Sequence, residues 1–286
     1  MASKALVAAC ALGVSVVGWA LPGLAQEVVT PMSTPVVGPS RYFIVPQANI
    51  LPAGSAVTSL NLQLNAAAPA AIAPGGGVPA PSAGLGLGFG YGGNALALSN
   101  QAAMGDLFQL DTGIAAYATT PWQGRLDLAG KMGLMQEKLG SLASVAGIAG
   151  IALNVNANGA PSLGFTLGVP IEKTLGFTPI NRLTLTAYPN WGTGLVAPGA
   201  IGAGFIPPTR FALGLGGALS LTDTVALMAD TSLVTGAPTL LNEGSNLGVR
   251  FGFTPNLTFD LFAGLGANAP VGSAPLSVGA GMNWVY

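Results

Sequence analysis

The sequence contains few charged residues for its length. Charged residues make up 7% of its 286 residues, whereas a globular domain carries about 25%. The mean hydropathy is also positive, at +0.60. A water-soluble fold of this size would have too few charged side chains to cover its surface. Because a surface that contacts lipid needs no charges, this shortage favours a membrane protein.

Histidine is absent altogether, which limits the enzyme chemistry that the chain could support. A Ser–His hydrolase or a His-dependent lipid A enzyme would lack its general base. The commonest metal ligand is missing too, and the single cysteine, Cys10, lies in an N-terminal apolar run. Catalysis by Asp111 and Asp127 alone is conceivable. Since Arg125 and Lys131 lie close by in the sequence, ion pairs are the better interpretation, and we expect no enzyme, no metal and no cofactor.

The first 25 residues have the pattern of a cleavable signal peptide. Lys4 supplies the positive start, residues 5–21 form the apolar stretch, and residues 22–25 provide a small-residue cleavage site before Gln26. A transmembrane anchor fits less well, because the apolar stretch is short and ends in Pro-Gly. Cleavage would remove one of the nine basic residues, which leaves eight against ten acidic ones. No basic patch or run indicates binding to nucleic acid or to anionic headgroups.

The rest of the chain lacks a helical membrane span. No apolar run of about 18 residues is free of Gly, Pro and polar interruptions. Closed β-barrels are the other structures that satisfy every backbone polar group in lipid. Their strands alternate apolar with polar or small residues over about ten positions, as residues 211–220, 247–253 and 257–265 do. We therefore predict an all-β fold, an antiparallel up-and-down transmembrane barrel over residues 53–286.

The alternation predicts about twelve strands, within a range of about ten to fourteen. They lie near residues 56–65, 84–98, 107–117, 124–134, 146–155, 162–169, 181–188, 210–220, 224–233, 246–254, 257–265 and 275–286. An even number places both ends of the barrel sequence on the periplasmic side. The short turns at 221–223 and 254–256 then fall on that side, and the long connections at 66–83 and 189–209 fall outside. A hairpin at Gly92-Gly93 or a strand within 135–145 would change the count.

Residues 26–52 precede the first predicted strand and contain several prolines, among them Pro31, Pro35, Pro39 and Pro46. Two interpretations are open for this N-terminal segment. It is a periplasmic extension, or it is tucked into the lumen of the barrel. The periplasmic tail is the simpler of the two.

The last strand carries a resemblance to a known class of proteins. Apolar and aromatic residues occupy alternate positions up to the end of the chain: Leu276, Val278, Ala280, Met282, Trp284 and Tyr286. The pattern resembles the C-terminal assembly signal of bacterial outer-membrane proteins, which ends in an aromatic residue. The resemblance implies a porin-like barrel in the bacterial outer membrane, surrounded by its lipids and inserted by the barrel-assembly machinery. It points to no specific family, and an ordinary amphipathic edge strand is the alternative for this segment alone.

If the large apolar residues face lipid, the opposite positions line the lumen and are mostly small. The charged residues on this inward phase are Asp111, Arg125, Asp127, Lys131, Arg182, Arg210, Asp230, Arg250 and Asp260. A symmetric turn around Pro255 places Arg250 directly across from Asp260. Such charges form a polar eyelet that selects solutes, or ion pairs that fix the strand register. Because positive and negative residues are nearly equal in number, we expect no strong selectivity for anions or cations.

These observations favour a porin-like channel for passive diffusion of small solutes. The alternative is a structural or adhesive barrel with a closed lumen that acts through its outer loops. A third interpretation is a transporter of lipophilic solutes with a side opening. The transported solute and the oligomeric state do not follow from the sequence.

Overall fold

The computed structural model describes residue 39 and residues 41–65, 94–118, 123–137, 143–156, 161–176, 181–193, 209–235, 241–265 and 276–286. Within these ranges the regular structure consists of β-strands that pair in antiparallel fashion. The same ranges contain no helix that is long and apolar enough to cross a membrane.

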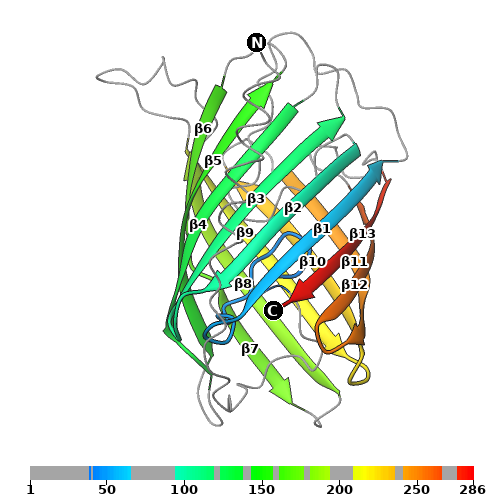
Figure 1. Cartoon of the computed structure of the whole chain (residues 1–286). Helices are drawn as coiled ribbons and strands as arrows, with labels where there is room; N and C mark the ends of the chain where they lie inside the picture. Colours follow the sequence, from blue (N-terminus) through cyan, green and yellow to red (C-terminus); the bar gives the residue numbers. More distant parts are fainter. Residues whose placement is uncertain are drawn as a thin grey trace.

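The strands form one continuous sheet that closes on itself (Figure 1). They are β1 (Ala56–Asn65), β2 (Asn94–Ala103), β3 (Phe108–Ala118), β4 (Gln123–Met135), β5 (Ser144–Asn156), β6 (Pro161–Gly168), β7 (Ile171–Gly176), β8 (Arg182–Thr193), β9 (Thr209–Ser220), β10 (Val225–Thr235), β11 (Leu241–Thr254), β12 (Leu257–Leu265) and β13 (Leu276–Val285). Closure comes from the pairing of β1 with β13, in which Leu60 lies opposite Met282. The first and last predicted strands are therefore neighbours, as expected.

Strands β6 and β7 occupy a single position in the barrel wall. Gly168 and Ile171 pair with β5 in one unbroken register, and both also continue one register along β8. The interruption falls at Pro170, which has no N–H to donate to the ladder. The barrel thus has twelve strands, which confirms the predicted number.

The short turns lie together at the end of the barrel that carries the start of β1 and the end of β13. Tyr286 exchanges two backbone hydrogen bonds with Ala56 there, at 2.9 and 3.3 Å. In outer-membrane barrels this end is the periplasmic one. The turn predicted at 254–256 is shorter than expected, because a bulge between Gly252 and Thr254 leaves only residues 255–256 in the turn. The long connections predicted at 66–83 and 189–209 lie outside the described residues, apart from 189–193, which extend β8, and Thr209, where β9 begins.

Two further boundaries differ from the sequence prediction. The second strand, expected near 84–98, begins at Asn94 and continues to Ala103. Residues 84–93, including the Gly92-Gly93 pair, lie outside the described part of the chain. The unassigned stretch 135–145 holds the end of β4 and the start of β5.

The two faces of the wall are opposite in chemistry. Large apolar side chains cover the outer face, where Leu62, Leu96 and Phe165 are about half exposed. The inner face of β1 instead buries Ser59 and Asn61. This distribution is the reverse of a water-soluble fold and is typical of a barrel that faces lipid.

The last strand follows the predicted alternation. Val278 is 50% exposed and Tyr286 64% exposed on the outer face, while Ser277 and Asn283 are buried on the inner face. The apolar and aromatic side chains of the proposed assembly signal thus form an outward row at the edge where the barrel closes.

Candidate functional site in the barrel lumen

Residues 41–51, here called the lumen segment, lie inside the barrel. They appear in Figure 1 as the blue coil that precedes β1. Their side chains are mostly buried, and they contact strands on opposite sides of the wall, such as Ser99 of β2 and Asp230 of β10. The simpler interpretation from the sequence, a periplasmic tail, is therefore wrong for these residues. These residues lie in the lumen because the inner face of the wall has recesses for their side chains and hydrogen-bond partners for their polar groups.

The lumen segment is anchored by a tight turn on one carboxylate. Arg41 and Pro46 form a bridge that closes the turn. The backbone N–H groups of Phe43, Ile44 and Val45 all donate to Oδ2 of Asp230, at 2.9, 2.5 and 3.0 Å. Successive N–H groups that converge in this way form an anion-binding nest. The second oxygen of the same carboxylate accepts a hydrogen bond of 2.9 Å from Asn246.

Glycines in the wall make room for the side chains of this turn. A Cβ added to Gly216 would overlap the ring of Tyr42, and one added to Gly214 would lie 3.0 Å from Cγ2 of Val45. Phe43 packs against Phe262, with ring centroids 4.9 Å apart. Since interiors are packed at close to crystal density, the absence of side chains at these glycines indicates that the wall is shaped for the lumen segment.

The phenol of Tyr42 is also satisfied inside the barrel. Its oxygen lies 2.9 Å from Oγ1 of Thr186, which in turn donates to Glu172 at 2.9 Å. Burial raises the pKa of the Tyr42 phenol, so the side chain stays protonated. It therefore remains available as a hydrogen-bond donor.

The other end of the lumen segment is bound to β3, β4 and β7. The Lys131 ammonium donates to the backbone oxygens of Asn49 and Gln47, at 2.7 and 3.3 Å. The side chain of Asn49 donates to the Glu172 carboxylate, and the N–H of Leu51 donates to Gln109 at 3.1 Å. These contacts fix the path from the turn to the start of β1.

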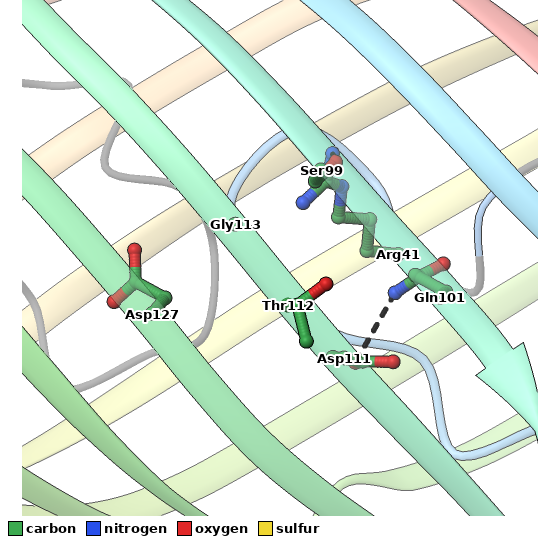
Figure 2. Close-up of a pocket in the computed structure, with 7 residues that line it drawn as sticks. All are labelled: Arg41, Ser99, Gln101, Asp111, Thr112, Gly113 and Asp127. Atoms are coloured by element: carbon green, nitrogen blue, oxygen red, sulfur yellow. Dashed lines mark hydrogen bonds between the residues drawn. The ribbon is translucent and has the colours of Figure 1, made fainter. Parts of the chain in front are cut away.

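A polar cluster lies where Arg41 meets strands β2 to β4 (Figure 2). The guanidinium of Arg41 donates to Oγ of Ser99 at 2.7 Å. Asp111 accepts hydrogen bonds from Gln109 and Gln101, at 2.6 and 3.2 Å. A cavity of about 10 Å³ lies among these residues and Asp127, enough for about one water molecule.

Two buried ion pairs flank this cluster. Arg125 binds Asp127 along β4 at 2.6 Å. Arg250 binds both oxygens of Asp260, at 2.7 and 2.9 Å, and the two residues are direct partners across β11 and β12. The predicted register of that pair is confirmed, although the turn beyond it is closed differently.

The structure brings most of the predicted charged residues into the lumen. Those on the inner face are Asp111, Arg125, Asp127, Lys131, Asp230, Arg250 and Asp260. Arg182 lies at the turn end of β8, opposite Gly176 and on the same alternation as the buried Thr184. Arg210 belongs to β9, but its side chain lies outside the described part of the structure.

Two charged residues of this site do not follow from the sequence predictions. Arg41 falls in the predicted tail, although the apolar run Tyr42–Val45 beside it would be poorly placed in water and is a sign of burial. Glu172 falls between two predicted strands, because Pro170 interrupts the alternation that continues through β7.

Comparisons with known proteins show the fold. No protein-family model and no curated protein sequence matches the chain. Among solved structures, the COG4313 outer membrane channel from Pseudomonas putida F1 is 12% identical, with a TM-score of 0.55 over 84% of this chain and 98% of that one. The NanC porin is 8% identical, with a TM-score of 0.52 over 79% and 98%. The chain thus has the fold of the integral β-barrel proteins of the bacterial outer membrane.

Proposed function

We propose that the protein is a porin-like channel for the passive diffusion of small solutes across the outer membrane. The observation that carries this proposal is a twelve-stranded barrel whose inner face is polar and charged while its outer face is apolar. The solved structures of the same fold are named as a channel and a porin. A barrel of this size encloses more space than its small inward side chains fill.

The lumen segment narrows this passage. Its turn at residues 42–45 is packed against β8 to β12, and residues 47–51 are bound to β3, β4 and β7. Solutes therefore pass along the side of the lumen that β1, β2 and β13 form. Several buried polar atoms there have no hydrogen-bond partner among the described protein atoms, namely Ser59 Oγ, Asn61 Nδ2 and Asn283 Oδ1. Buried polar atoms of this kind bind water or a polar solute, which supports a wet path.

Several features of this proposal come from the sequence and need their own tests. Residues 1–25 are removed on export, and the barrel-assembly machinery inserts the chain through its terminal strand. The mass of the purified protein tests the first point, because cleavage would leave Gln26 as the first residue. The channel is not an enzyme, and it needs no cofactor.

Conductance in planar bilayers tests the proposed function directly. The purified protein should produce stepwise current increases in salt solution. A variant that lacks residues 41–51 should give larger steps, because the widest obstruction in the lumen is gone. If both proteins insert and stay silent, the channel is refuted. The remaining interpretation would then be a closed structural or adhesive barrel that acts through its outer loops.

A further inference from the structure

Arg41 is the one cation that the lumen segment itself brings into the lumen. Its side chain is 6% exposed and points from the anchored turn toward β2, where it binds Ser99. We infer that Arg41, a residue of the lumen segment and not of the barrel wall, determines the charge selectivity of the channel. This inference rests on the proposed channel function.

The charges of the wall around Arg41 support this inference. Asp127 and Asp260 are each paired with an arginine of the wall. Asp111 is held by the amides of Gln101 and Gln109, and among the described residues it forms no ion pair with a cation. Lys131 of β4 also acts on Asp111, but its ammonium donates to the backbone oxygens of Gln47 and Asn49. Arg41 is therefore the second cation that offsets the negative charge of Asp111.

The position of Arg41 relative to the wall carboxylates also supports this inference. Ser99, which binds Arg41, pairs with Gly113, and Gly113 pairs in turn with Asp127. Two residues closer to the turn end of β2, Gln101 pairs with Asp111. Arg41 therefore reaches the wall at the height of the two carboxylates, and Gly113 leaves the space between them open. The water-sized cavity described above lies at this point (Figure 2).

The electrostatic surroundings agree with this arrangement. Burial lowers the pKa of the Arg41 guanidinium, and the main opposing influence is the Asp111 carboxylate, with Asp260 and Asp127 adding to it and Arg250 opposing it. Arginine nevertheless stays protonated in proteins. Arg41 thus brings a permanent positive charge to a buried polar part of the lumen, where charges are weakly screened and act strongly on passing ions.

Reversal potentials across a KCl gradient test the inference. Arg41→Gln should raise the K⁺ over Cl⁻ permeability ratio severalfold, because Asp111 loses one of the two cations that offset its charge. Asp111→Asn should shift the ratio toward Cl⁻, and the double variant should return close to wild type. Lys173→Gln is the control, since Lys173 lies near the turn end in a pair with Glu137 and should leave the ratio unchanged.

These measurements distinguish a failure of the selectivity inference from a failure of the proposed channel function. A wild-type channel that conducts, with an Arg41→Gln variant of unchanged selectivity, overturns this inference alone. A wild-type barrel that stays silent overturns the proposed function, and the inference falls with it.

A thiol probe gives a readout that does not depend on conductance. Cys10 is the only cysteine of the sequence, so Arg41→Cys in a Cys10→Ser background has a single thiol. A cationic methanethiosulfonate should modify it severalfold faster than an anionic one of similar size, and Asp111→Asn should reduce that ratio. Equal rates would show that Asp111 does not set the potential there, and no reaction with either reagent would show that ions in the lumen do not reach this position. Either result would contradict the inference.

Discussion

Two sides of the lumen are built differently. On the side of β8 to β12, Gly216 and Gly214 receive side chains of the lumen segment, and Asp230 binds its backbone. Residues 47–51 are bound to β3, β4 and β7. On the side of β1, β2 and β13, the wall presents buried hydroxyls and amides, and Arg41 of the lumen segment binds Ser99 there. The first side holds the turn of the lumen segment in place, and the second is the side along which we propose that solutes pass.

The difference shows how one barrel combines a fixed obstruction with a passage. Packing against glycines and a carboxylate nest fixes the position of the lumen segment, because both require close approach of the backbone. On the other side, buried polar atoms such as Ser59 Oγ and Asn283 Oδ1 have no partner among the described protein atoms and are suited to bind water or a polar solute. We therefore expect some residues to control the width of the passage and others to control only the stability of the wall.

The largest effect is expected from removing the anchor of the lumen segment. Asp230→Ala leaves three buried N–H groups without an acceptor, at a cost of about 1–3 kcal/mol each. The turn should leave its place, and the single-channel conductance should rise severalfold. Asn246→Ala is the matched control, because it removes one hydrogen bond to the same carboxylate and should change conductance far less. Equal conductance in Asp230→Ala and wild type would show that this contact does not hold the lumen segment.

The next largest effect is expected on the stability of the barrel wall and not on the passage of solutes. Asp260→Asn breaks the buried pair with Arg250 and should destabilise the barrel by about 3 kcal/mol, since an uncompensated charge remains buried. Unfolding in urea, followed by the mobility of the folded barrel on gels, measures this change. Arg250→Met combined with Asp260→Leu should recover most of the loss. If Asp260→Asn keeps wild-type stability, the pair does not fix the register.

A smaller effect is expected from adding one methyl group to the inner wall. Gly216→Ala places a Cβ against the ring of Tyr42 and should cost about 1–3 kcal/mol by overpacking, with a modest rise in conductance. Gly217→Ala is the matched control, because its Cβ would meet only Leu185 at 3.4 Å among side chains. Similar conductance and stability in the two variants would mean that the recess at Gly216 does not position the lumen segment.

The sequence predicts the strands of the barrel wall better than the segment that lies in the lumen. Alternation has a period of two in every strand, so the pairing of Arg250 with Asp260 follows from local pattern alone. The bulge near Gly252 shifts the end of that hairpin by one residue, and alternation carries no sign of it. Pro170 likewise conceals β7, because the strand continues past a residue that cannot donate to the ladder.

The lumen segment could not be predicted in the same way. The Ile44 N–H group and the Asp230 carboxylate that binds it are 186 positions apart in the chain. The glycine that accommodates Tyr42 is only one of many in the sequence. Their match depends on the closed geometry of the barrel, which local patterns do not encode.

The central claim is that solutes pass beside a lumen segment that stays in place. Val45→Cys and Gly214→Cys, in a Cys10→Ser background, place two thiols where Cγ2 of Val45 would lie 3.0 Å from a Cβ on Gly214. We expect the disulfide to form and the oxidised channel to conduct as wild type does, with Asp230→Ala no longer able to raise its conductance. A disulfide that silences the channel would contradict the account, because passage would then require the lumen segment to leave the barrel.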